Sequence, residues 1–373
     1  MSLINIIRED KIILPEELNL YFKNKFKSSV KLPTFFADEP YIHSWETYCE
    51  KSSKHGTFQT LKNCYPQLHF PIEEGINKTQ AYIDAVLKGK TESINLVNKL
   101  KLNNPDGIEI CIHKSIAGKV PVLKIPDGQD FIKIIQCLLH KNNPISVPLS
   151  MGAILINGIN NWDRLNNLKN DWLKNNPTGN WSKEFSNNVL SNPDLFKDKI
   201  IILSTKPYSN VNASQLGMSD IEWGQYSYSI RLEHECTHLY TLKKYGYASN
   251  NLHDELIADY IGIVKTNGKY NINWMLSFMG LENYPNYRKG ARLENYLGNS
   301  DLSFENFSTL TTIIKNAIEN IANFDSRLGK INSDKDRVSR IKTLCETGVL
   351  DIASKSGVNL LVEKYYKISE QTA

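Results

Sequence analysis

The chain has 373 residues, of which 41% are hydrophobic and 23% charged, a composition that excludes a disordered, collagen-like or coiled-coil protein. Its formal net charge is +4, from 44 Lys+Arg and 40 Asp+Glu, with no dense basic stripe, so neither a nucleic acid nor a membrane is expected as a partner. Six scattered cysteines without metal-binding spacing, and no recognisable secretory or membrane-spanning segment, predict a reduced cytoplasmic protein.

The first half of the chain gives the β-type patterns. Residues 1–105 are mixed, with one clear helical segment near residues 78–88. Strands are predicted at 108–113, 120–125, 147–156 and 199–204, with helices between them at 131–140 and 162–173. The run at 147–156 contains Gly152, which fits equally a buried strand with a bulge and an edge strand that pairs with a peptide.

After residue 204 the periodicity is almost wholly helical. We predict helices at 221–245, 252–265, 272–279, 286–297, 304–321, 335–344 and 359–367. The fold class is therefore α+β. Three regions are expected: a mixed, partly helical region at 1–105, a sheet-bearing α/β lobe at 106–220 and a helical lobe at 221–373.

The first long helix of the helical lobe contains one strong motif, H-E-x-x-H, at His234, Glu235 and His238. Residues four apart share a face of an α-helix, one turn apart, so the two imidazoles can bind one metal ion. Glu235 is offset from them, so that its carboxylate can reach a water on the metal, as a general base must. Cys236 falls on a separate apolar stripe and is expected to pack in the core.

A catalytic zinc site usually has three protein ligands, so a third ligand is expected downstream. The next predicted helix begins after a possible N-cap region at 249–251 and carries Glu255 and Asp259, which are four apart and share a face. The linker between the two helices is short, which favours antiparallel neighbours. That arrangement would bring Glu255 back towards the histidines.

Together these motifs resemble those of the gluzincin metallopeptidases, in which HExxH is followed by an E-x-x-[AS]-D motif, here Glu255-Leu256-Ile257-Ala258-Asp259. The resemblance covers about residues 230–262. It implies a zincin-like fold with the metal site between the sheet lobe and the helical lobe. It also implies one Zn²⁺ held by His234, His238 and Glu255, with Glu235 as base and proton shuttle and Asp259 orienting a ligand histidine.

Several weaker candidates also have a purely structural explanation. Tyr284, Tyr287, Arg288 and Arg292 could supply an oxyanion-stabilising group; for any one of them a solvated helix is the slightly better explanation, but we expect one of the four to matter. His253 could contact substrate or the metal, although a surface position in the first turn of its helix explains it better. Cys111 and His113 lie two apart on a strand and could form a Cys/His hydrolase, but packing is the better explanation.

The sequence therefore predicts a zinc-dependent hydrolase, most simply a metallopeptidase or amidase acting on a peptide, a protein or an amide-containing small molecule. Two alternatives stay open. The first is a specialised metal-dependent enzyme that acts on one small molecule or one partner protein. The second is a binding protein in which zinc stabilises the helical pair without turnover.

Overall fold

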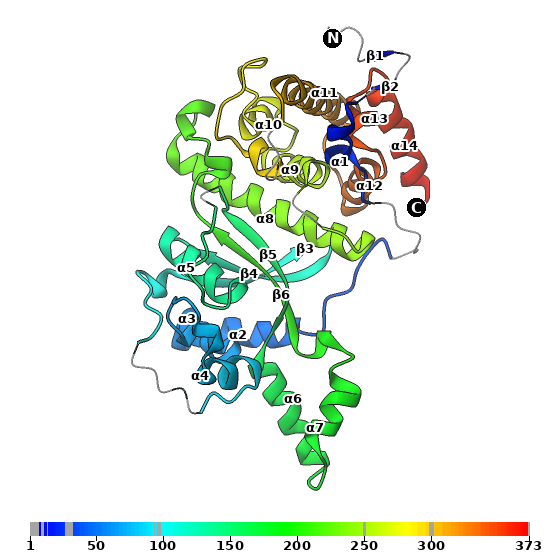
Figure 1. Cartoon of the computed structure of the whole chain (residues 1–373). Coiled ribbons are helices and arrows are strands. Elements are labelled where there is room, and N and C mark those ends of the chain that lie inside the picture. The colour runs from blue at the N-terminus through cyan, green and yellow to red at the C-terminus, as the bar shows by residue number, and fades with distance from the viewer. Residues whose placement is uncertain are drawn as a thin grey trace. The chain divides into compact units, whose positions relative to one another are not determined.

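Figure 1 shows the computed structural model, which describes residues 7–8, 11–12, 14–26, 33–92, 94, 98–148, 150–248, 251–297 and 302–371. The chain divides into two compact units. Ala37–Lys206 form one, which we call the sheet unit. Met1–Phe36 and Pro207–Ala373 together form the other, the helical unit.

This division differs from the three regions predicted from the sequence. The first 36 residues belong with the C-terminal helices, and residues 37–105 belong with the sheet. In the helical unit, the Tyr21 hydroxyl donates to the carbonyl of Leu297 at 3.1 Å, and the Asn24 amide donates to the carbonyl of Cys345 at 3.0 Å. Contacts between segments so distant in sequence leave no local pattern, so the sequence could not assign the first 36 residues.

The sheet unit is built on four strands in the order β3-β4-β6-β5. Their bounds are β3 Glu109–Ser115, β4 Gly118–Ile125, β5 Ala153–Asn160 and β6 Lys197–Ser204. The central pair, β4 and β6, is parallel, and the outer strands β3 and β5 are antiparallel to their neighbours. Ile200, Ile201, Ile202 and Leu203 are all fully buried, as expected for a central strand with a continuous apolar run. The mixed sheet and abundant helices confirm the predicted α+β class.

The strand predicted at 147–156 is displaced in the structure. β5 begins at Ala153, after Pro148, whose nitrogen has no hydrogen to donate to a ladder. Gly152 therefore precedes the strand, so a bulge at Gly152, one of the two alternatives that the sequence left open, does not form. The register shift falls instead between Asn157 and Ile159, where Gly158 has a φ of 90° that favours glycine.

Helices complete the sheet unit, and its apolar core lies among α2, α3, α5 and the strands. The two helices α2 and α3 were not predicted. α2 contains Ser, Thr, Cys and His, which are weak helix formers. Its stability comes from burying residues such as Trp45. The segment predicted near 78–88 is helical, as α4 and a following π-helical turn. The helices are α2 Ile42–His55, α3 Thr57–Cys64, α4 Gln80–Tyr82, α5 Gly128–Leu139, α6 Trp162–Asn175 and α7 Trp181–Glu184.

The helical unit contains two short strands and eight α-helices among the residues that the structure describes. The strands are β1 Ile7–Arg8 and β2 Lys11–Ile12, and the helices are α1 Asn19–Phe22, α8 Asp220–Tyr245, α9 Leu252–Asn267, α10 Ile272–Met279, α11 Phe304–Leu328, α12 Asp334–Cys345, α13 Val349–Ala353 and α14 Gly357–Gln371. Across the described ranges, no helix combines the length and the apolar character needed to cross a membrane.

The helix predicted at 286–297 is wrong. Asn283 and Asn286 form an isolated β-bridge around Pro285, and Gly290 has a φ of 78°, so the segment turns before a helix can begin. Only a short 3-10 helix, η11 at Arg292–Tyr296, forms there. The periodic side chains of this segment are therefore presented by a loop.

Candidate metal centre

Two neighbouring helices of the helical unit, α8 and α9, carry the predicted motifs. The Ser219 side chain accepts the backbone N–H of Glu222 at the start of α8, and Gly246 ends the helix in a left-handed conformation, as its position after two lysines predicts. The Ser229 and Thr266 hydroxyls meet at 2.9 Å near one end of the pair. His238 and Asp254 meet near the other end, so the two helices are antiparallel, as predicted.

α9 lies in the interior of the helical unit, because every residue from Leu252 to Val264 is buried. Its N-cap is Asn251, which accepts the N–H groups of His253 and Asp254; the other two residues of the predicted cap region lie outside the described residues. Charged side chains on so buried a helix need partners, since an unpaired buried charge is costly. The acidic residues of α9 face the histidines of α8, and some also have partners outside that helix.

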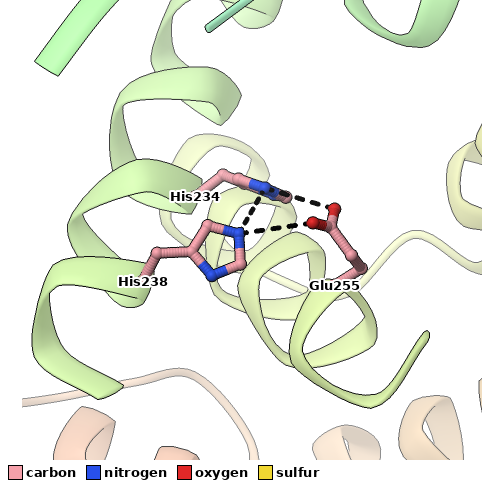
Figure 2. A group of neighbouring side chains, drawn as sticks. All are labelled: His234, His238 and Glu255. Carbon is pink, nitrogen blue, oxygen red and sulfur yellow. Dashed lines mark hydrogen bonds and ion pairs between the residues drawn. The ribbon is translucent and has the colours of Figure 1, made fainter. Parts of the chain in front are cut away.

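The predicted ligand residues converge at one point (Figure 2). His234 and His238 project from consecutive turns of α8, with their Nε2 atoms 3.0 Å apart. Glu255 meets them from α9, with Oε2 3.5 Å from His234 Nε2 and Oε1 3.6 Å from His238 Nε2. One ligand atom from each residue lies within 4.8 Å of the other two. Two imidazole nitrogens and a carboxylate oxygen form a donor set typical of catalytic zinc sites.

The outer nitrogen of each histidine is held by an aspartate of α9. His234 Nδ1 lies 2.8 Å from Asp259 Oδ1, and His238 Nδ1 lies 3.1 Å from Asp254 Oδ2. The other oxygen of Asp254 accepts from the Thr241 hydroxyl at 3.4 Å. When Nδ1 carries the hydrogen that each aspartate accepts, the Nε2 lone pairs point into the cluster, which is the arrangement that a metal requires. The sequence predicted Asp259 in this place but not Asp254.

Three further side chains enclose the cluster. Arg292 forms an ion pair with Asp259, and the Tyr208 hydroxyl donates to Asp259 Oδ1 at 2.5 Å. The Tyr296 hydroxyl donates to Glu255 Oε2 at 3.1 Å. Sequence reasoning missed Tyr208 and Tyr296, because neither has a local pattern that marks it. Asp254 had a weak signal, since it adjoins a predicted ligand at the start of a helix.

Glu235, the predicted base, is buried and directly follows His234 in sequence. Burial lowers the pKa of His234 to about 4, and the negative charges of Glu255 and Glu235 oppose that effect. The guanidinium of Arg231 also lies within the electrostatic reach of Glu235. The Glu235 carboxylate is therefore close enough to act on the charge of the cluster.

The buried charged side chains around the cluster carry more negative than positive charge. Four carboxylates, those of Glu235, Asp254, Glu255 and Asp259, contribute −4 when ionised, and the guanidinium groups of Arg231 and Arg292 contribute +2. With both histidines neutral, these six groups carry a net charge of −2. A divalent cation would neutralise this charge in a region where water cannot screen it.

Opposing effects set the pKa values of two side chains of the cluster. Burial lowers the pKa of His238, but Asp254 and Glu255 outweigh burial and hold that pKa well above its usual range. Burial raises the pKa of Glu255, but the two histidines outweigh it and bring that pKa to about 2.

The remaining predicted site residues lie elsewhere in the helical unit. His253 is buried, contrary to the surface position that we favoured: its Nε2 donates to the carbonyl of Leu344 at 2.8 Å. The Tyr284 hydroxyl pairs with Thr312, and the Tyr287 hydroxyl donates to the carbonyl of Ala291. Arg288 binds the Glu282 carboxylate and the carbonyl of Ser277. Among the four oxyanion candidates, Arg292 is the one that we find bonded to the residues around the ligands.

The fold and the site together define an α+β protein with a buried His-His-Glu cluster that could hold a metal ion. The chain belongs to a protein family of unknown function, DUF7005, whose model matches residues 3–356. No curated protein and no solved structure matches it.

Proposed function

We propose that this protein is a zinc-dependent hydrolase that cleaves an amide bond, as a peptidase or an amidase. The observation that carries the proposal is the convergence of His234 Nε2, His238 Nε2 and a Glu255 carboxylate oxygen within 4.8 Å. Paired aspartates fix both histidines, as they do in metal sites where the ligand orientation matters. The donor set suits zinc, because two histidines and one glutamate are a ligand set of catalytic zinc sites.

Zinc bound there would polarise the scissile carbonyl and lower the pKa of water from 15.7 towards about 7. The Glu235 side chain would accept a proton from the attacking water and deliver it to the leaving amine. Its burial beside the ligands limits access of bulk water to that proton.

The test compares the zinc-loaded full chain with Glu235→Gln, in a peptide library read by mass spectrometry. The substitution keeps the size of the side chain and removes its basicity, so zinc content should be unchanged and hydrolysis should fall by roughly 10²–10⁴-fold. Glu222→Gln, at an exposed position in the first turn of the same helix, is the matched control and should retain full activity.

Two results would contradict the proposal. One is equal hydrolysis by the wild type and Glu235→Gln. The other is a zinc-loaded wild-type chain that cleaves no peptide in the library and no simple amide. Cleavage of a single substrate among many would instead identify a specialised hydrolase that uses the same site.

A further inference from the structure

We propose that Arg292 is a positioning residue, which acts on the ligand His234 through Asp259. This inference rests on the proposed metal site and extends it to a residue outside both motifs. Arg292 binds Asp259 Oδ2 through one guanidinium nitrogen, and its other terminal nitrogen donates to the Tyr208 hydroxyl and to Ser209 Oγ, each at 3.1 Å. Asp259 Oδ1 faces His234 Nδ1. A continuous chain of polar contacts therefore joins Arg292 to a ligand.

The Asp259 carboxylate, at the centre of these contacts, needs a partner on each of its oxygens. The Asp259 side chain is fully buried, and water cannot compensate its charge. The guanidinium supplies that compensation on Oδ2, and the hydroxyl of Tyr208 occupies Oδ1 beside the imidazole of His234. With each oxygen engaged by a separate group, the carboxylate plane is fixed, and with it the direction of the His234 ring.

Tyr208 is itself held rigidly. Its backbone N–H donates to Ser227 Oγ on α8 at 3.0 Å, and its ring packs edge-on against Phe278 of α10 at 4.9 Å between centroids. The guanidinium groups of Arg231 and Arg292 lie 5.5 and 5.4 Å from the centre of the same ring. The phenol therefore has little freedom to turn away from Asp259.

The loop that carries Arg292 is also fixed, at the end of α10. Arg288 N donates to the carbonyl of Gly280 at 2.9 Å. A β-carbon on Gly280 would lie 2.3 Å from the β-carbon of Ala291, the residue before Arg292, so only glycine allows this approach. The irregular segment that forms in place of the predicted helix therefore holds Arg292 rigidly. Precise orientation of the proposed ligand His234 requires such rigid support.

The role follows from these contacts. Arg292 reaches the ligand through Asp259 and has its terminal nitrogens committed to protein groups, so its loss should disturb the metal and its surroundings more than substrate binding. We expect weaker metal affinity and, at saturating metal, a lower kcat with KM changed by less than about threefold. A residue that bound the oxyanion directly would leave metal affinity unchanged.

The experiment titrates the metal-free full chain with Co²⁺ and Zn²⁺, against a chromophoric chelator, and records the Co²⁺ visible spectrum. Arg292→Met should weaken metal binding about 10–100-fold and alter the spectrum, and Arg292→Lys, which keeps the charge, should recover part of both. Arg327→Met, at an exposed position in α11 where the arginine binds Asn359, should match the wild type. Combining Arg292→Met with Asp259→Asn should cost less than the sum of the two separate losses, because both residues reach His234 through one connected set of contacts that includes Tyr208.

The outcomes separate this inference from the proposed function. Wild-type affinity and spectrum in Arg292→Met would overturn the inference and leave the metal site standing. If Arg292→Met does not fold, the folded Arg292→Lys variant decides, since unchanged affinity and spectrum there would also overturn it. A wild-type chain that binds no metal would refute the site and the inference together. Metal binding without hydrolysis would refute only the proposed reaction, because the inference is judged on affinity and spectrum.

Discussion

Gly262 on α9 faces the backbone carbonyl of Ile230 on α8, and a β-carbon on Gly262 would lie 2.8 Å from that oxygen. Real β-carbons do not approach a carbonyl oxygen so closely, so glycine sets the distance between the two helices at this point. Ile230 lies one turn before His234, and Gly262 lies two turns after Glu255. The spacing of the ligands therefore depends on a residue that touches none of them.

Replacing Gly262 with alanine should push α9 away from α8. The clash is with backbone, so the relief needs a helix shift, and we expect a net loss of about 1–2 kcal/mol after the better helix propensity of alanine is counted. Zinc affinity should fall as well. Chemical denaturation and zinc titration measure the two effects.

Gly224, also in α8, provides the matched control, because a β-carbon there would meet nothing within 4 Å. Gly224→Ala should raise stability by roughly 0.5–1 kcal/mol, since glycine is unfavourable inside a helix. Equal stability changes in the two variants would show that the close approach at Gly262 has no energetic role.

Asp254 should contribute to metal affinity although it is not a ligand. Asp254→Asn keeps the shape of the side chain and an oxygen for Thr241, but removes the charge that faces His238 Nδ1. We expect zinc affinity to fall about 10–100-fold, measured by competition with a chelator. Asp171→Asn, at an exposed position in α6, is the control and should bind zinc as the wild type does. An unchanged affinity in Asp254→Asn would show that His238 needs no orienting partner.

The parts of the site that the sequence predicted are those encoded within single helices. The i, i+4 spacing of His234 and His238, and of Glu255 and Asp259, determines a shared face wherever the segment is helical. Tyr208 and Tyr296 reach the site from short 3-10 helices whose positions depend on tertiary packing, and neither was predicted. The zincin-like topology and a site placed between two lobes stay predictions. All the residues described at the site belong to the helical unit.

The errors in the fold have a similar origin. The pattern at 286–297 is helical in its side chains, but Pro285 and Gly290 impose turns that the periodicity does not show. α2 contains weak helix formers, yet it buries Trp45 and Tyr48 in the core of the sheet unit. At 286–297 local backbone geometry overrides the helical periodicity. In α2 the burial of side chains in the core overrides weak helix propensity.

His253 predicts a pH effect on stability. Burial lowers the pKa of its imidazole, against the weaker opposing effect of its hydrogen bond to Leu344, whereas the unfolded chain has a value of about 6.5. Between those two pKa values the unfolded state binds more protons than the folded state. The contribution of His253 to the free energy of unfolding is therefore complete above about pH 6.5 and is lost as the pH falls towards the pKa of the folded state.

The variant His253→Gln should therefore be less stable than the wild type at about pH 7.5, by a margin that narrows at about pH 5.5. Urea denaturation of the metal-free chains at both pH values measures the margin. The exposed His55 serves as the control, and His55→Gln should change stability little at either pH. A margin that stays constant or widens on acidification would contradict the expected direction.

The central claim is that His234, His238 and Glu255 hold one zinc ion. Calorimetric titration of the metal-free full chain with Zn²⁺ tests it most directly. We predict one tight site per chain, and a loss of affinity of more than about 100-fold in His238→Ala and in Glu255→Ala, beyond the effect of removing an orienting partner. His55→Ala should bind as the wild type does. Absence of a tight site, or equal affinity in the two ligand variants and the wild type, would contradict the claim.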